Sequence, residues 1–190
     1  MKEYSNEIKW EMVTALRYYK VTSLIKALIQ KHGPELASAH LFCERDPMGG
    51  NMTALHYLVM CAPDVTETVK ALKLLVSTKG VNINARRGDR TPLYYASANR
   101  KFNLSWELMR YGATVGKKEI SICCWDMGNC CWDMGQLRIK DQLLSILNNP
   151  PRTYKQEAID KKNLLAMILH KRVNLGTMDD ILQMLCDLGY

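Results

Sequence analysis

No run of apolar residues in this sequence approaches the roughly 18–20 residues that a helix needs to cross a bilayer. The amino-terminal stretch MKEYSNEIKWEM is polar and charged, and it lacks the apolar core of a secretory signal. A disulfide-stapled module is disfavoured as well, because seven cysteines is an odd number and 190 residues is long for such a module. We therefore expect free thiols in a reducing compartment, no membrane association, and a cytoplasmic or nuclear location.

The motifs of the common enzyme classes are also missing. The sequence contains no Gly-rich phosphate loop, no H-E-x-x-H, no G-x-S-x-G and no Cys-x-x-Cys. Its four histidines are scattered along the chain. A thiol enzyme that pairs Cys43 or Cys61 with a distant histidine stays open as an alternative. We predict a protein without catalytic activity and without a cofactor.

The composition is that of a globular chain with a basic excess. Hydrophobic residues make up 47% of the chain and charged residues 24%, so a core can form, and we expect a single domain over residues 1–190. The 26 Lys and Arg against 19 Asp and Glu give a net charge of +7. Such an excess favours acidic partners through long-range attraction, although it also serves solubility alone.

Four segments carry large apolar side chains three or four residues apart and then end at a glycine. This spacing places the apolar side chains on one face of a helix. Glycine is favoured just past a helix because it readily adopts the left-handed conformation found there. The sequence therefore predicts amphipathic helices that end at these glycines. The segments are Leu24–Gly33, Ala71–Gly80, Ser105–Gly112 and Asp180–Gly189, and a weaker fifth is Asp141–Pro150.

A second string recurs upstream of the first three segments, as TALRYY at Thr14, TALHYL at Thr53 and TPLYYA at Thr91, at spacings of 39 and 38 residues. A fainter copy begins at Asn163, two steps of 36 further on, which leaves room for another near residue 127. Periods of 20–50 residues indicate stacked repeats. We predict an all-α chain of about five units, each a short helix with a threonine N-cap followed by a longer helix. The approximate units are 5–45, 46–83, 84–116, 117–150 and 151–190.

Several of these strings resemble the ankyrin repeat. TALH (Thr53–His56) and TPLYYA (Thr91–Ala96) resemble the TPLHxA signature of the family. VNINARRGDRTPL (Val81–Leu93) is similar to the finger between two repeats, and RYGATV (Arg110–Val115) to the end of a second helix and the start of the next finger. The resemblance covers roughly residues 46–116. It implies an ankyrin-like helical solenoid with short hairpin-like fingers and divergent outer repeats that act as caps.

The likeness also bears on function. It gives His56 a structural role, hydrogen-bonding backbone between repeats, and it implies a non-catalytic module that binds a protein on its concave face. We expect a monomer. A compact stand-alone chain with divergent outer repeats is further similar to the intracellular mimics that viruses and intracellular bacteria direct at host proteins, which would place it in a host cytosol.

The expected binding face follows from the likeness: finger tips, the residue before each repeat threonine, and the ends of the short helices should face the partner. The cations among these positions should gather on one side, beside exposed Met48 and Met52. Arg and Met are enriched at interfaces, and Arg forks suit carboxylates, so we expect an acidic peptide or acidic protein surface as the partner. The expected binding residues are Met48, Asn51, Met52, Met60, Arg86, Arg87, Asp89, Arg90, Asn99, Arg100 and Lys101.

Nucleic acid is the rival partner. The basic pairs Lys117–Lys118, Lys161–Lys162 and Lys171–Arg172 could contact phosphates, which gives affinity without sequence readout. These pairs stand mostly at expected helix ends, where cations also complement the helix dipole. No nucleic-acid-binding signature accompanies them. A protein partner is therefore favoured.

Three tyrosines, at positions 18, 57 and 95, each stand four residues after a repeat threonine. Recurrence at one repeat position could indicate a binding stripe. It is more typical of packing between units, with the hydroxyl at the rim. We predict that Tyr18, Tyr57 and Tyr95 belong to the core.

The stretch Ile122–Gly135 repeats the letters CCWDMG. Four thiolates suit zinc, but structural zinc sites use Cys-x-x-Cys spacing, and adjacent cysteines point in different directions. A disulfide is disfavoured in a reducing compartment. The favoured interpretation is a tandem duplication within the fourth unit, because seven added residues are close to two helical turns and keep each face in register. An extended loop between two helices stays open, and we predict no metal.

Overall fold

The computed structural model describes residues 3–17, 21–41, 52–124 and 134–170. The described residues form ten helices and no strand, which confirms the all-α prediction. The chain divides into two compact units, Met1–Thr153 and Tyr154–Tyr190. The described helix of the second unit is α10 (Tyr154–His170). None of the helices described is both long enough and apolar enough to cross a bilayer.

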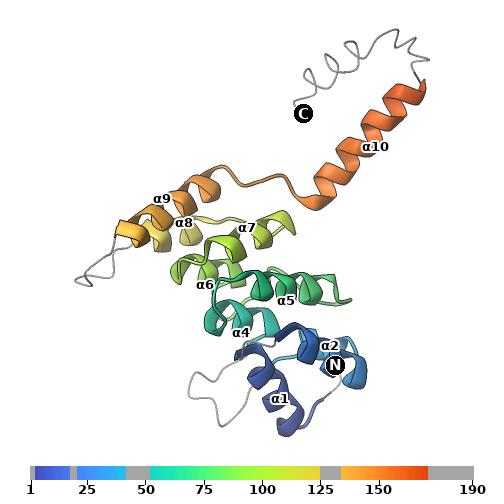
Figure 1. Cartoon of the computed structure of the whole chain (residues 1–190), viewed down its shortest axis with the longest axis vertical. Coiled ribbons are helices and arrows are strands. Elements are labelled where there is room, and N and C mark those ends of the chain that lie inside the picture. The colour runs from blue at the N-terminus through green and yellow to red at the C-terminus, as the bar shows by residue number, and fades with distance from the viewer. Residues whose placement is uncertain (1–2, 18–20, 42–51, 125–133, 171–190) are drawn as a thin grey trace. The chain divides into compact units, whose positions relative to one another are not determined.

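The first unit is built from helix pairs stacked in two layers (Figure 1). Helices α1, α4, α6 and α8 contact one another in succession, and so do α2, α5, α7 and α9. Within each pair the two helices also pack together. The bounds are α1 (Asn6–Arg17), α2 (Val21–His32), α3 (Glu35–Ser38), α4 (Ala54–Cys61), α5 (Thr66–Ser77), α6 (Pro92–Ala98), α7 (Phe102–Arg110), α8 (Lys117–Cys124) and α9 (Met134–Asn148).

Threonine N-caps open two of the short helices, as predicted. The Thr91 hydroxyl accepts a hydrogen bond from the N–H of Tyr94 (3.1 Å), and Pro92 follows at the first helical position, where its missing N–H costs nothing. The N–H of Thr53 donates to Nδ1 of His56 (3.3 Å), so that α4 begins with a reciprocal capping arrangement. Each cap satisfies a backbone donor that a helix start leaves without an intrahelical partner.

The predicted glycine stops are confirmed for the first three segments. Gly33 (φ +101°) directly follows α2, and Gly112 (φ +93°) stands two residues after α7. Gly80 also has a positive φ, three residues past the end of α5. Positive φ is disfavoured for residues with a Cβ, which explains why glycine ends these segments. The segment Asp180–Gly189 lies outside the described residues.

The prediction that Thr14 opens a helix is wrong. Thr14 lies inside α1, which begins eight residues earlier. The Ser5 hydroxyl accepts from the N–H of Ile8 (3.4 Å) and supplies the cap instead. The string at Asn163 likewise falls inside α10. A TAL string therefore marks a helix start only where no capping residue and amphipathic segment precede it.

The fourth helix pair begins earlier than the period indicates. Helix α8 starts at Lys117, ten residues before position 127, because the turn after Gly112 leads into it within four residues. The CCWDMG duplication starts in the last turn of α8 and ends in the first turn of α9. Residues 125–133 lie outside the described part, so the zinc, disulfide and duplication interpretations stay untested.

The core lies between the two layers and between successive pairs. Tyr57 (1% exposed) and Tyr95 (9% exposed) are buried in it, which confirms the core prediction for both, while Tyr18 is outside the described residues. Leucines at helical spacing supply the rest, for example Leu72 and Leu75 of α5. Each buried leucine contributes roughly 1.5–3 kcal/mol relative to exposure. Helices as short as these are unstable alone in water, so this packing is what holds them.

The loop after α4 caps the following pair. The two carboxylate oxygens of Asp64 accept hydrogen bonds from the N–H groups of Asn103 (2.9 Å) and Leu104 (3.0 Å), at the start of α7. The carboxylate also complements the positive end of the helix dipole. The residue before α7, Lys101, contributes no side-chain cap to its own helix. Helix α7 therefore depends on the preceding pair for its N-cap.

His56 of α4 is fully buried where the second and third helix pairs meet. Its Nδ1 accepts from Thr53, so the proton of the neutral ring is on Nε2. Its ring packs edge-on against Tyr95 of the next pair, with centroids 5.8 Å apart. Burial lowers the pKa of His56 to about 4, and the nearby backbone of Arg90 opposes this shift. In the described part of the chain its Nε2 has no hydrogen-bond partner, so the expected role of His56, bonding backbone between repeats, is not borne out.

We predict that His56 makes stability fall with acid. Its folded pKa lies below the unfolded value near 6.5, so the unfolded state binds more protons between pH 6.5 and 4, and stability is lost as the pH falls through that window. At pH 5 the loss relative to pH 7 amounts to about 2 kcal/mol. Urea unfolding at both pH values measures it. His56→Gln should abolish the loss, whereas His40→Gln, at an exposed position, should keep it. An unchanged pH dependence in His56→Gln would contradict the assignment.

Candidate partner-binding surface

A tight hairpin joins the second and third helix pairs. The N–H of Arg87 donates to the carbonyl of Arg90 (2.9 Å), and the N–H of Arg90 donates to the carbonyl of Arg87 (3.2 Å). Gly88, with φ +63°, and Asp89 form the turn between them. Two-residue turns of this kind need positive φ, which glycine provides at little cost. The hairpin occupies the position expected for a finger.

Two of the hairpin's arginines are exposed and one is half-buried. Arg86 and Arg90 are exposed, and the guanidinium of Arg90 lies 5.2 Å from the ring centroid of Tyr94, a cation–π geometry. Arg87 is the half-buried residue. Arg86 forms no salt bridge with any residue that the structure describes. The tip of the hairpin therefore presents cations on a fixed backbone.

Asn84 fastens the hairpin to the next turn of the chain. Its backbone N–H is held by the side chain of Asn82 (2.9 Å). Its own Oδ1 accepts from the N–H of Thr114 (2.9 Å), and its Nδ2 donates to the carbonyl of Gly112 (3.5 Å). The hairpin and the segment before α8 are thereby held side by side.

A hollow of about 400 Å³ lies between the hairpin and the segment Thr114–Glu119. On its wall Lys118 forms an ion pair with Asp89. Glu119 is buried there, and its oxygens accept from the Thr91 hydroxyl (2.8 Å) and the Gly116 N–H (3.0 Å). Arg86 and Lys117 complete the charged wall. From the sequence, Lys117 and Lys118 were expected only as possible nucleic-acid contacts. The ion pair of Lys118 with Asp89, and the position of Lys117 in the same hollow, were not predicted.

Lys101, one of the expected binding residues, has a capping role in the structure. Its ammonium group donates to the carbonyls of Val59 (2.7 Å) and Met60 (3.0 Å) in the last turn of α4 and to that of the C-cap residue Ala62 (2.5 Å). Burial lowers the pKa of Lys101. A helix leaves its last four carbonyls without intrahelical donors, and a cation at that end also complements the dipole. Lys101 therefore caps the preceding pair, and its expected role in partner binding stays untested.

Met52 is also not an exposed interface residue. It is fully buried, and its carbonyl accepts from the N–H of Leu41 (2.7 Å). Met60 is half-buried against the core. Met48 and Asn51 lie outside the described residues. The expected pairing of exposed methionines with the arginines is therefore wrong for Met52.

The expected cations do not form one cluster. Arg100, a half-buried residue with φ +54°, follows the far end of α6 from Arg90. The seven residues of α6 separate the two ends by roughly 10 Å. Asn99 is exposed, and its side-chain amide donates to the carbonyl of Tyr95 (2.8 Å) at the end of α6. The structure thus keeps Arg86, Arg87, Asp89 and Arg90 together and separates them from Asn99, Arg100 and Lys101.

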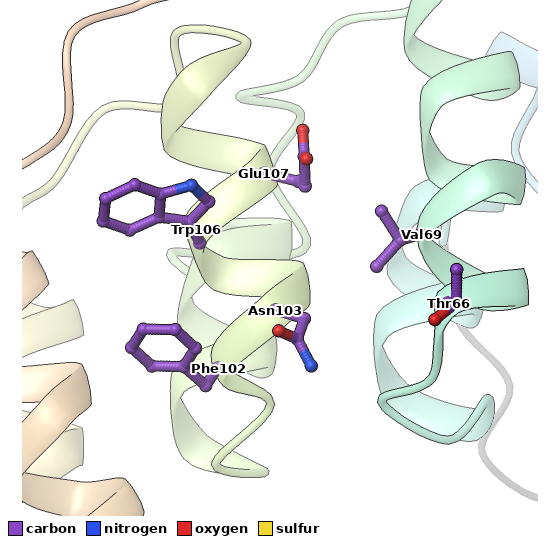
Figure 2. Close-up of a pocket in the computed structure, with 6 residues that line it drawn as sticks. All are labelled: Thr66, Val69, Phe102, Asn103, Trp106 and Glu107. Atoms are coloured by element: carbon purple, nitrogen blue, oxygen red, sulfur yellow. The ribbon is translucent and has the colours of Figure 1, made fainter.

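A second hollow, of about 430 Å³, runs between α5 and α7 and was missed from the sequence. Figure 2 shows Asn103 and Glu107 turned toward Val69, with the rings of Phe102 and Trp106 on the other side of α7. The two rings stack with centroids 6.3 Å apart, and Trp106 is 37% exposed. The spacing of four residues between them is the one sequence signal that could have indicated this aromatic pair.

Among the described side chains, no group of three or more His, Cys, Asp or Glu is placed to hold a metal. Cys61 is a half-buried free thiol. Among known proteins, no family model, curated protein or solved structure matches the chain.

We predict that Lys101→Met lowers the free energy of unfolding by about 1–3 kcal/mol, because it removes the donor to carbonyls at the end of α4 but keeps an apolar stem. Urea denaturation at neutral pH measures the change. Lys26→Met, at an exposed position of α2, is the matched control and should change stability by less than about 0.5 kcal/mol. Equal effects of the two substitutions would show that the capping bonds contribute nothing.

Proposed function

We propose that the chain is an ankyrin-like helical solenoid that acts as a non-catalytic binding module, and that it docks an acidic surface or peptide of a partner protein with its Arg87–Arg90 hairpin. The stacked pairs, the threonine caps and the hairpin between two pairs support the ankyrin-like part of the proposal. Stacked repeats present an extended face to which fingers contribute, so the hairpin is a natural point of contact.

The observation that carries the proposal is the display of guanidinium groups on a preorganised backbone. The hairpin is closed by two backbone hydrogen bonds, and Asn84 ties it to the next segment. Arg90 is additionally held over the ring of Tyr94. Groups that are already ordered lose little entropy on binding, and arginine pairs bidentately with carboxylates. An acidic protein surface is the partner that gains most from this arrangement.

A nucleic-acid partner fits the arrangement less well. Binding to a phosphate backbone gains from cations that follow a strand over several nucleotides. Here Arg86, Arg90 and Lys117 are confined to the hairpin and the adjacent turn, and Lys118 already pairs with Asp89. The test below includes nucleic acid as a separate outcome.

We predict that replacing Arg86, Arg87 and Arg90 together by Glu weakens binding of the protein partner at least about tenfold, because each reversal turns attraction into repulsion at a desolvated contact. The partner is first captured from cytosol and identified by mass spectrometry, and its affinity is then measured by titration calorimetry. Circular dichroism checks that the variant is folded.

The matched control replaces Lys26, Lys31 and Lys155 by Glu. All three are exposed and lie away from the hairpin in sequence, and the change in net charge is the same. This variant should bind within about twofold of wild type. Equal weakening by both variants would reduce the effect to net charge and contradict a hairpin site. Capture of duplex DNA in place of a protein, with affinity falling steeply as salt rises, would favour the nucleic-acid alternative.

A further inference from the structure

The hollow beside the hairpin differs in chemistry from the aromatic one between α5 and α7. Its wall combines the exposed side chains of Arg86 and Lys117 with the ion pair of Lys118 and Asp89. Within the described chain, neither Arg86 nor Lys117 has a salt-bridge partner. Its volume of about 400 Å³ lies in the range of roughly 300–1,000 Å³ typical of ligand sites. A polar hollow with surplus cations is suited to an anion.

The two carboxylates on this wall have different roles. Glu119 is buried and bonded at both oxygens, to the Thr91 hydroxyl and the Gly116 N–H, and it occupies the N-terminal end of α8. It is therefore part of the scaffold. Asp89 is 62% exposed at its side chain, and it contacts Lys118 and, at 4.0 Å, Arg90. Exposed ion pairs of this kind are weak and readily exchange partners.

The contacts of Asp89 show that the cations beside this hollow bind a carboxylate. The hydrogen bond from Lys118 lowers the pKa of Asp89, so the group is a carboxylate at neutral pH. The chain thereby displays a carboxylate in contact with cations of the hairpin and of the first turn of α8. A carboxylate from another molecule offers the same oxygens, and it would also meet Arg86 and Lys117, which Asp89 leaves without a salt bridge.

We propose that the hollow lined by Arg86, Lys117 and Lys118 receives an acidic side chain of the partner protein, and that Asp89 is a built-in competitor that the partner's carboxylate displaces from Lys118. The inference rests on the proposed function and deepens it, because it places the partner's aspartate or glutamate in one pocket. Exchange of one carboxylate for another keeps Lys118 paired throughout, so the free energy of opening the pocket is small. The side chain of Asp89 thereby tunes affinity, whereas its backbone belongs to the turn of the hairpin.

The test uses a fluorescein-labelled hexaglutamate peptide, with hexaglutamine as the uncharged control, and fluorescence anisotropy at about 150 mM salt to screen distant charges. Asp89→Asn removes the competing charge and keeps the side-chain shape, so it should tighten hexaglutamate binding about three- to tenfold. Arg86→Gln and Lys117→Gln should each weaken it about two- to fivefold. Lys26→Gln, on α2, should leave it unchanged. Hexaglutamine should not bind to any variant.

Amide NMR shifts of the wild-type protein locate the peptide. Hexaglutamate should shift the signals of Gly88, Asp89 and the segment Thr114–Lys117, and leave those of α2 in place. Absence of hexaglutamate binding, unchanged or weaker binding by Asp89→Asn, or shifts confined to another surface would each overturn the proposal. So would a short duplex DNA that binds this hollow more tightly than hexaglutamate does.

The outcomes separate this inference from the broader proposal. If the Arg86, Arg87 and Arg90 reversal releases the protein partner while Asp89→Asn and Lys117→Gln have no effect on it or on hexaglutamate, the hairpin binds the partner and the pocket inference is wrong. If the pocket variants change hexaglutamate binding as expected but the hairpin reversal leaves the protein partner bound, the proposed function is wrong. The same variants therefore decide both questions.

Discussion

Exchange of helix caps between neighbouring pairs is the constraint on which the central part of the structure depends. Lys101 donates to carbonyls at the end of α4, and Asp64 accepts from the first N–H groups of α7. Each pair thus completes a helix end of the other. Because α4, α6 and α7 are eight, seven and nine residues long, none could persist alone in water. Capping and the buried layer between pairs stabilise them together.

This constraint also positions the hairpin. The second arm of the hairpin leads directly into the Thr91 cap of α6, and the same hydroxyl donates to Glu119 at the start of α8. Asn84 joins its other side to the turn at Thr114. The arginines therefore stand on a backbone fixed to the third and fourth pairs rather than on an isolated loop. A binding surface of this kind is preorganised by the stack beneath it.

Local signals in the sequence predicted the helix ends at Thr53, Thr91 and Gly112, although not the start of α1. Burial between pairs was predicted for Tyr57 and Tyr95 but not for Met52. Thr53, Thr91 and Gly112 act within a few residues of themselves, so their roles could be predicted from spacing. Met52 and Lys101 were expected on the surface, because no local pattern indicates which groups of the preceding pair lie next to them. Met52 is buried in the core, and Lys101 donates to carbonyls at the end of α4. The cations of the hairpin were identified from the sequence. That Lys117 lines the same hollow as Arg86 could be seen only in the folded structure.

Native-state hydrogen exchange tests most directly whether neighbouring pairs form one cooperative unit. The slowest amides of α4, α5, α6 and α7 should report opening free energies that agree within about 1 kcal/mol, because loss of one pair removes caps and core from the other. Opening of α6 and α7 at a free energy several kcal/mol lower, with α4 and α5 still protected, would contradict the account. The caps would then be incidental contacts between independently stable pairs.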